Sequence, residues 1–422
     1  MRVLVVHQNF PGQFGHLAMT WAARPGWDVR ALAHETAPGL AGFHRLARYR
    51  LARQAHAHQH PYLRQMEAAT LHGQAAARAM LDMRRSGFIP DVIVAHPGWG
   101  ETLYAKDIYP NAGLIHLCEW YYSADGADLG FDPEFPTTLD DRTRIRTWNA
   151  LHTLNLTHCD AAVSPTRWQR SRHPAIFQSK IAVQHEGIAT DRLRPDPTAS
   201  FETCSGVQLS AGAPVITYVA RNLEPYRGFH VFMRALEHIQ RVHPDCHALI
   251  VGGDATSYGQ RPKNSSNWRE HLLREVKLDP LRTHFLGRLA YADYVRVLQV
   301  SAAHVYLSYP FVLSWSLLEA MACGALILGS DTAPVREVIQ NGVNGRLVDF
   351  FDPQGVAEQV LDSLDPSAMS CALRAQARMD AQRFSRHNGV DGYDRLLRSA
   401  APWLARTLVQ DDAAFDPNTS VS

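Results

Sequence analysis

Short runs of apolar residues alternate with longer amphipathic stretches along most of the chain. The first run, Val3–Val6, is followed by a glycine-bearing turn and an apolar helical stretch at His16–Ala23. Strands that alternate with helices in this way predict a parallel sheet covered by helices. In the first half we expect strands at 3–6, 28–33, 91–95, 113–117 and 161–164, with long helices at 61–86 and 137–156.

The segment 192–200 breaks this alternation, because it is rich in proline and carries no periodicity. We interpret it as leading into a linker between two domains. A second alternation follows, with strands expected at 215–220, 246–251 and 283–286 and helices at 228–240, 267–276 and 291–301. The pattern therefore predicts an α/β protein with two doubly wound domains, residues 1–200 and 201–385. The polar, non-periodic tail 410–422 is expected to be disordered.

Composition places the chain among soluble globular proteins. It has 422 residues, 46% of them hydrophobic and 20% charged, which suffices for two domains with their own cores. The formal net charge of +1 gives no overall field for binding nucleic acid. The six cysteines are scattered without a Cys-x-x-Cys pair, which favours free thiols in a reducing cytoplasm over disulfides or a zinc site. No apolar run approaches the ~20 residues of a membrane span, and the first run is broken too early for a signal peptide.

The most informative stretch, residues 304–328, predicts a buried strand, a turn, a helix and a second strand. Ser314 is a good helix N-cap, and the amides after it would point at an anion. Glu319 lies one to two turns into that helix, flanked by apolar residues, so its carboxylate needs a partner or a ligand with hydroxyl groups. Gly324 would end the helix.

A second motif follows the strand 215–220. Arg221 and Arg227 flank a short loop that ends at Gly228. Two arginines offer planar forks that can hold phosphate oxygens, although two surface arginines beside a loop would also account for the pattern.

Together these motifs resemble those of glycosyltransferase family 4, retaining sugar transferases of the GT-B fold. That family has a Glu, seven residues and a second Glu before Ala-Met-Ala-x-Gly; the second Glu is Glu319 here, and Phe311 stands at the first position. It also has a Gly-Arg and Lys-Gly pair, which Arg221 and Arg227 match. The resemblance implies two Rossmann-like domains facing across a cleft, with a helix at 386–400 crossing back so that about 386–409 joins the first domain.

The resemblance also implies the donor site. Arg221 and Arg227 would hold the diphosphate, and Glu319 the ribose hydroxyls. Backbone groups near Arg288 and Leu289 would frame the base. The amides from Leu313 through Ser314 and Trp315 to Ser316 would hold the sugar phosphate, because Phe311 accepts no hydrogen bond.

In the first half, Gly12 and Gly15 match the family's early glycine loop, although a plain tight turn would look the same. His96 closes a predicted strand, where its side chain would reach the ligand edge of the sheet. Near the end of the next strand, either His116 or Glu119 could take the family's acidic or histidine position beside the transferred sugar.

Two further patterns suggest sites of other kinds. His56, His58 and His60 could suggest a metal, but their spacing and the lack of acidic companions favour a solvated loop. Arg45, Arg48, Arg50 and Arg53 alternate with apolar residues, which predicts a solvated helix or one lying on an anionic membrane.

We therefore predict an enzyme that moves a hexosyl unit from a nucleoside diphosphate sugar to a sugar, lipid-linked or small-molecule acceptor. It would serve polysaccharide, glycolipid or glycoconjugate synthesis in the cytoplasm or at the inner membrane face. The absence of Asp-x-Asp beside two candidate cations predicts no metal and no cofactor other than the donor. The alternatives are a non-catalytic module that binds nucleotide sugars and a GT-B epimerase that acts on the nucleotide sugar itself.

Overall fold

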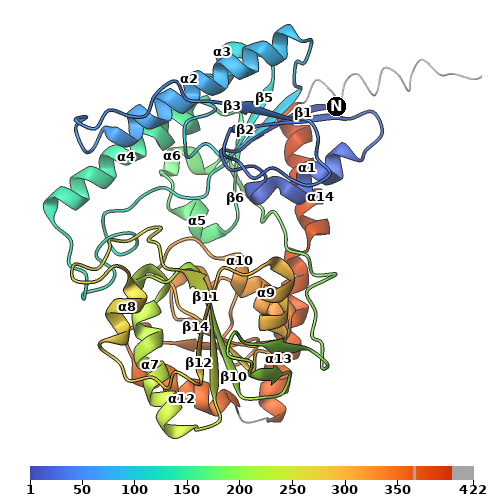
Figure 1. Cartoon of the computed structure of the whole chain (residues 1–422). Coiled ribbons are helices and arrows are strands. Elements are labelled where there is room, and N and C mark those ends of the chain that lie inside the picture. Colours follow the sequence, from blue (N-terminus) through green and yellow to red (C-terminus); the bar gives the residue numbers. More distant parts are fainter. Residues whose placement is uncertain (365–366, 402–422) are drawn as a thin grey trace, which may run out of the picture. The chain divides into compact units, whose positions relative to one another are not determined.

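The computed structural model describes residues 1–364 and 367–401, which form two compact units (Figure 1). Unit 1 consists of Met1–Asp125, Glu134–Gly187 and the described residues from Arg386 to Ala401. Unit 2 consists of Gly126–Pro133 and Ile188–Ser385. The second unit thus starts at Ile188 rather than at 201, and it includes a short segment from within the first half. The predicted tail 410–422 lies outside the described residues.

Unit 1 is built on a parallel sheet of seven strands in the order β3-β2-β1-β4-β5-β6-β7. Its elements are β1 (Arg2–Val6), η1 (Gly12–Phe14), α1 (Gly15–Ala22), β2 (Asp28–His34), β3 (Leu46–Tyr49), α2 (Arg64–Arg85), β4 (Val92–Ala95), α3 (Ala105–Ile108), β5 (Gly113–Leu117), α4 (Leu139–His158), β6 (Ala161–Ser164), α5 (Arg167–Ser171), α6 (Ala175–Gln178), β7 (Ile181–Val183) and α14 (Arg386–Ala400).

The central strands of this sheet are buried on both faces, so β1 and β4 consist almost entirely of apolar residues. Val3 and Val5 of β1 face one core, which α1 and α14 cover, whereas Leu4 and Val6 face the other, which α2 covers (Figure 1). The helix predicted at 386–400 is α14. If β1 slipped by one residue against its neighbours, each of its side chains would move to the opposite core. The packing of the two cores therefore fixes the register of the strand.

Unit 2 repeats the plan with a parallel sheet of six strands in the order β12-β11-β10-β13-β14-β15 and an antiparallel hairpin, β8-β9. Its elements are β8 (Ser200–Glu202), β9 (Gln208–Ser210), β10 (Val215–Asn222), η2 (Pro225–Arg227), α7 (Phe229–Val242), β11 (His247–Gly253), α8 (Trp268–Leu273), β12 (Thr283–Gly287), α9 (Tyr291–Gln299), β13 (Ala303–Tyr306), α10 (Trp315–Ala322), β14 (Leu326–Ser330), α11 (Ala333–Arg336), β15 (Arg346–Val348), α12 (Pro353–Leu364), α13 (Ala368–Ala381) and η3 (Gln382–Phe384).

Both sheets contain the doubly wound order 3-2-1-4-5-6, to which unit 1 adds β7 as a seventh strand beside β6. The prediction of two doubly wound α/β units is confirmed. Each sheet reverses its direction of growth between its first and fourth strands. In unit 1 these strands are β1 and β4, and in unit 2 they are β10 and β13.

The arginine-rich segment is a strand, so the helix predicted there is wrong. Leu46–Tyr49 forms the edge strand β3 and pairs with β2. Its arginines are engaged within unit 1: Arg45 with Asp28 at 2.7 Å, Arg48 with the carbonyls of residues 34, 35 and 37, Arg50 with Glu35 at 3.5 Å, and Arg53 with Glu67 at 2.7 Å. Over only four residues, a mixture of charged and apolar side chains fits an edge strand as well as an amphipathic helix.

His56, His58 and His60 lie in an exposed loop, as predicted. None of the helices in the described part of the chain has the length and apolar character that crossing a bilayer requires.

The Asp394 carboxylate ties α14 to α1. It accepts hydrogen bonds from Trp21 Nε1 at 2.9 Å and from Arg24 at 3.0 and 2.7 Å, and it is largely buried. We expect Asp394→Ala to lower the free energy of unfolding of unit 1 by about 2 kcal/mol, because it leaves a buried indole N–H and a guanidinium without their acceptor. Urea denaturation would measure this. The exposed pair of Asp391 and His387 on the same helix gives the control, since Asp391→Ala should change stability by less than about 0.5 kcal/mol. Equal effects of the two variants would contradict the role of Asp394.

Candidate functional site

Doubly wound sheets bind ligands beyond the carboxyl ends of their strands, where the strand order reverses. There the loops after the two central strands turn to opposite faces of the sheet and leave a crevice. In unit 2 the reversal lies between β10, which ends at Asn222, and β13, which ends at Tyr306. Of the predicted donor residues, Arg221 is the last but one residue of β10 and Arg227 follows that strand. Phe311 and Ser314 follow the end of β13.

Arg227 places a cation in a fixed position at this reversal point. Its side chain is buried, and Nη1 donates to Ser308 Oγ at 2.9 Å and to the Val312 carbonyl at 3.0 Å. The same nitrogen lies 3.4 Å from the Tyr306 hydroxyl, which also accepts from the Ser314 amide at 2.8 Å. Tyr306 therefore links the guanidinium to the N-cap of α10. A buried charge is costly unless it is paired or meets an anionic ligand.

Aromatic rings surround this guanidinium. The rings of Tyr258 and Phe311 lie with their centroids 5.6 and 5.9 Å from the Arg227 Cζ atom. Tyr226 packs edge-on against Phe311 at 5.7 Å and stacks on Tyr309 at 4.7 Å. We call Tyr226, Tyr258, Tyr309 and Phe311 the aromatic layer. Phe311 thus packs with the layer, where it contributes a ring and no hydrogen-bonding group.

A buried carboxylate that the sequence reasoning missed shapes the next loop. Glu224 accepts hydrogen bonds from the successive amides of Ser257, Tyr258 and Gly259 at 3.1–3.2 Å. These bonds place the Tyr258 ring beside Arg227. The available signal was a lone acidic residue after a strand, between a leucine and a proline.

Helix α10 begins as predicted. Ser314 is its N-cap and accepts from the Ser316 amide, and Gly324 follows the helix with a φ of +80°. Leu313, Ser314 and Trp315 are partly exposed at this end, whereas Ser316 is buried.

Glu319 is buried and already has local donors. Its carboxylate oxygens accept from the hydroxyls of Tyr291 at 3.0 Å and Tyr294 at 2.7 Å, both on α9. The sequence reasoning foresaw the need for a partner but missed these two tyrosines. Each carboxylate oxygen has capacity for a further hydrogen bond, so the ribose role stays a prediction.

The remaining donor residues lie at the same edge of the sheet. Arg221 is exposed, and no hydrogen bond joins it to the described residues. Arg288, exposed, and Leu289, partly exposed, follow β12. A Cβ on Gly253 would approach Arg288 Nε to 3.1 Å, so this guanidinium lies against the end of β11.

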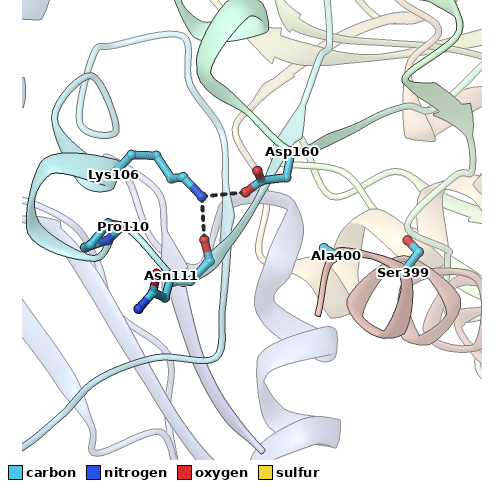
Figure 2. Close-up of a pocket in the computed structure, with 7 residues that line it drawn as sticks. Lys106, Pro110, Asn111, Asp160, Ser399 and Ala400 are labelled. Carbon is cyan, nitrogen blue, oxygen red and sulfur yellow. Dashed lines mark hydrogen bonds and ion pairs between the residues drawn. The ribbon is translucent and has the colours of Figure 1, made fainter. Parts of the chain in front are cut away.

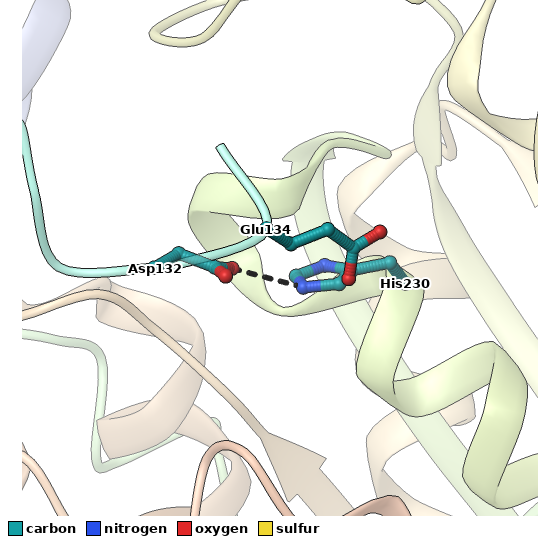
Figure 3. A group of neighbouring side chains, drawn as sticks. All are labelled: Asp132, Glu134 and His230. Atoms are coloured by element: carbon teal, nitrogen blue, oxygen red, sulfur yellow. Dashed lines mark ion pairs between the residues drawn. The ribbon is translucent and has the colours of Figure 1, made fainter. Parts of the chain in front are cut away.

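The inserted segment Gly126–Pro133, here called the strap, packs beside this edge. The Asp132 carboxylate lies 3.0 Å from His230 Nε2 and accepts from the Tyr309 hydroxyl at 2.9 Å; Figure 3 draws this pair together with Glu134 of unit 1. The Asp128 carbonyl accepts from the Tyr226 hydroxyl. Asp132 and His230 are residue types that bind metals, but the two side chains that unit 2 itself contributes do not make a metal site.

In unit 1, four polar side chains meet at the reversal point of the sheet. His96, after β4, lies 3.2 Å from Glu119, and Gln13 donates to the same carboxylate at 3.2 Å. The His7 ring lies 2.9 Å from the Gln13 carbonyl oxygen and contacts the His96 ring. The sequence reasoning named His96 and Glu119, and the structure brings them together. It missed His7 and Gln13, although the polar triplet directly after β1 was visible.

This cluster stabilises the charged form of the Glu119 carboxylate. Its partial burial raises the pKa, but the hydrogen bonds from His96 and Gln13 and the charges of His96 and His7 outweigh burial, so the pKa of Glu119 is lowered. Gly12 has a φ of +49°, and a Cβ there would lie 2.3 Å from His7 Nε2. Glycine is therefore required at position 12 for the histidine to occupy its place. Gly15 has an ordinary helical φ of −56° as the first residue of α1.

Burial distinguishes the two candidates His116 and Glu119. His116 has no exposed surface, and its Nε2 lies 2.9 Å from the Thr102 hydroxyl. The Glu119 side chain is 38% exposed. Of these two side chains, that of Glu119 is the one accessible to a ligand.

A second polar cluster at the same edge was not predicted. The Tyr49 hydroxyl donates to Glu101 at 2.7 Å and lies 2.7 Å from the His72 ring, and Gln8 approaches that ring at 3.1 Å. Burial raises the pKa of Glu101, and burial, followed by the charge of His34, lowers the pKa of His72 to about 4. The neighbours His7 and Gln8 thus lead into two different clusters.

A surface pocket of about 710 Å³ lies at the opposite edge of the unit 1 sheet, beside the amino ends of β5 and β6 (Figure 2). Lys106 lies in it and donates to Asp160 at 2.8 Å and to the Ala112 carbonyl at 2.9 Å. None of the predicted site residues lines this pocket.

Comparison with known proteins is consistent with this geometry. The family profile described as "Glycosyl transferase family 4 group" matches residues 25–193, and that of "Glycosyl transferases group 1" matches residues 205–380. Among solved structures, Anabaena HepE in complex with UDP and glucose aligns with a TM-score of 0.65 and 18% identity, over 94% of this chain and 100% of that chain. Two Rossmann-like units of this kind define the GT-B class. The chain belongs to glycosyltransferase family 4.

Curated relatives resemble parts of the chain. A GDP-mannose-dependent alpha-(1-6)-phosphatidylinositol monomannoside mannosyltransferase of Mycolicibacterium smegmatis is 27% identical over 52% of this chain and 56% of its own length. A D-inositol 3-phosphate glycosyltransferase of Rhodococcus jostii is 26% identical over 55% of this chain and 50% of its own length. The chain thus spans about half the length of the curated relatives it matches.

Buried histidines make stability depend on pH. Burial lowers the pKa of His116 in unit 1 to about 3. In the unfolded chain a histidine titrates near 6.5, so the contribution of neutral His116 is complete above about pH 6.5 and falls by about 1.4 kcal/mol per pH unit below it. We expect urea denaturation of His116→Gln to show a shallower loss of unit 1 stability between pH 6.5 and 5 than wild type. His387→Gln, at an exposed position, is the control. Equal slopes for wild type and His116→Gln would contradict a neutral buried imidazole.

Proposed function

We propose that this protein is a retaining glycosyltransferase that moves a sugar from a nucleoside diphosphate sugar to an acceptor hydroxyl without a metal ion. One observation carries the proposal: the buried Arg227 guanidinium lies at the reversal point of the unit 2 sheet and is linked through Tyr306 to the N-cap of α10. A fixed cation beside a helix N-terminus is suited to a diphosphate.

Charge accumulates on the diphosphate as the bond to the sugar breaks. Arg227, held in place by Ser308 and Val312, and the exposed Arg221 would stabilise that charge in the transition state. The sequence contains no Asp-x-Asp that would carry a metal for the same purpose. In a retaining transfer the acceptor oxygen attacks from the face that the phosphate leaves, and the departing phosphate takes the acceptor proton.

The His96–Glu119 pair supports a further part of the proposal. Glu119 can accept hydroxyl hydrogen bonds, and His96 beside it can donate or accept a proton. We propose that this pair holds hydroxyl groups near the transferred sugar. The same pair also supports the epimerase alternative, because epimerisation needs an acid and a base.

The donor and the pathway are also matters of proposal. The names of the similar proteins mention GDP-mannose in one case and UDP with glucose in another, so both nucleotides belong in the first screen. The acceptor would be a sugar, a lipid-linked sugar or a small molecule in polysaccharide, glycolipid or glycoconjugate synthesis.

A cytoplasmic reaction fits the chemistry of the cysteines, because all six are free thiols in the structure. A contact with anionic lipid through Arg45, Arg48, Arg50 and Arg53 has less support, since each of these arginines already has partners within unit 1.

The proposal is tested by incubating the protein with UDP- and GDP-sugars and a panel of hydroxyl acceptors, with and without EDTA. We expect a glycoside that keeps the donor's anomeric configuration, and activity that survives EDTA. Loss of activity that added metal restores would contradict metal independence, and inverted product would contradict retention. Binding without turnover or donor hydrolysis would indicate a binding module, and a changed sugar on the nucleotide without any acceptor would indicate an epimerase.

In the same assay Arg221→Ala should lower turnover by roughly a hundredfold, because it removes a charge aimed at the leaving group. Its stability should not change, since Arg221 is exposed. Arg241→Ala, an exposed arginine late in α7, is the matched control and should keep full activity. Ordinary turnover by Arg221→Ala would count against the two-arginine mechanism.

The ribose assignment of Glu319 gives a separate prediction. Glu319→Gln should weaken binding of both the bare nucleotide and the nucleotide sugar tenfold to about a hundredfold, because both carry the ribose and a charge-assisted hydrogen bond is lost. Calorimetry measures both affinities.

Tyr294→Phe controls for the internal contact of Glu319. It removes a local donor to the carboxylate and leaves the carboxylate free to bind ribose, so affinity should hold or rise. Unchanged nucleotide affinity in Glu319→Gln would show that the ribose binds elsewhere.

A further inference from the structure

The strap Gly126–Pro133 contacts the rest of unit 2 through three kinds of interaction. Asp132 approaches His230 at 3.0 Å and accepts from the Tyr309 hydroxyl at 2.9 Å. The Phe131 ring packs at 4.9 Å against Tyr309 and at 5.2 Å against Phe350. The Asp128 carbonyl accepts from the Tyr226 hydroxyl. The strap therefore holds two of the four members of the aromatic layer by their hydroxyl groups.

These contacts continue without interruption to the buried cation. Tyr309 stacks on Tyr226 with ring centroids 4.7 Å apart. Tyr226 meets Phe311 at 5.7 Å, and Phe311 lies 5.9 Å from the Arg227 Cζ atom. The backbone joins the same elements, because the Tyr309 amide donates to the Tyr226 carbonyl at 3.0 Å. A change in the position of Tyr309 therefore reaches Arg227 through packed rings and the backbone.

Burial makes the strap contact demanding. Asp132 and His230 are 4% and 2% exposed, and Tyr309 is 4% exposed. A carboxylate so deeply buried must keep its donors, so it specifies one position for the Tyr309 ring. With phenylalanine at position 309, packing alone would hold the ring, and the ring could shift. The hydrogen bond from the Tyr309 hydroxyl to the Asp132 carboxylate prevents this shift.

From these contacts we infer that Asp132 is a positioning residue for the donor site: it fixes Tyr309 and, through Tyr226 and Phe311, holds the aromatic layer in the arrangement that keeps Arg227 ready for a diphosphate. The ligand would be a nucleoside diphosphate or its sugar ester. The inference rests on the proposed function for its ligand, but the mechanical link from the strap to Arg227 can be tested without one.

The first measurement uses the ligand-free, full-length protein. Hydrogen–deuterium exchange should be faster by about tenfold in the amides of 224–228 and 306–314 in Asp132→Ala than in wild type, because the layer loses its anchor. Tyr309→Phe, which keeps the ring and removes only the hydroxyl, should show the same change and serves if Asp132→Ala folds poorly. Asp391→Ala is the matched control, since it removes an acid paired with a histidine elsewhere in the chain. Unchanged exchange in both strap variants would overturn the inference.

The second measurement is calorimetry with UDP and GDP as probes. Asp132→Ala should bind the better probe about tenfold more weakly, and Asp132→Asn, which still accepts from Tyr309, should recover most of that loss. In a double-mutant cycle, Asp132→Ala combined with Arg227→Ala should bind within about twofold of Arg227→Ala alone, because the strap acts through that cation. Fully additive losses would overturn the positioning role.

The two measurements separate the possible failures. If wild type binds neither nucleotide nor any nucleotide sugar, the proposed function fails, and the exchange data still decide whether the strap fixes the layer. If wild type binds and Asp132→Ala binds equally well, the inference fails and the proposed function stands.

Discussion

The central strands of each sheet are buried on both faces, and this constraint determines where most polar chemistry can lie in the molecule. Strands buried in this way are mainly apolar, so most polar side chains gather where the strands end. At the reversal points the loops diverge and leave room there. His7 and His96 occupy that position in unit 1, as Arg227 and Tyr306 do in unit 2. The same arrangement thus produces two polar clusters of different character, one rich in histidine and one centred on arginine.

Arg227 shows how a buried cation organises its surroundings. Its hydrogen bonds go to neutral oxygens of Ser308, Val312 and Tyr306, and its Cζ atom lies 5.6 and 5.9 Å from the ring centroids of Tyr258 and Phe311. Neutral oxygens orient a guanidinium without cancelling its charge, so the cation keeps its attraction for an anion. Phe311 supports this arrangement, because an acidic residue at that position would place a competing negative charge beside the cation. The departure from the family pattern is therefore compatible with anion binding.

The sequence predicted what depends on local pattern. Apolar runs located the central strands, and Ser314 and Gly324 marked the ends of α10, because capping and periodicity are local properties. Edge strands such as β3 were not predicted, because four residues with charged side chains form too short a pattern. Contacts between distant segments were not predicted either. Glu319 accepts a hydrogen bond from Tyr294 of another helix, and the sequence between them gives no sign of this contact. His7 and Gln13 were visible as polar residues after β1, but only the fold shows that they join Glu119.

The strap has a consequence for how such proteins recombine. The chain passes from one unit to the other after Asp125, Pro133, Gly187 and Ser385, so neither unit is a single stretch of sequence. A chimera joined only near residue 187 would pair the strap of one parent with the His230 and Tyr309 positions of the other. Its second half would then receive a carboxylate fitted to a different pocket. Exchange of a complete unit 2 between relatives therefore has to include residues 126–133. A short loop from the first half of the sequence is thus inherited together with the second half.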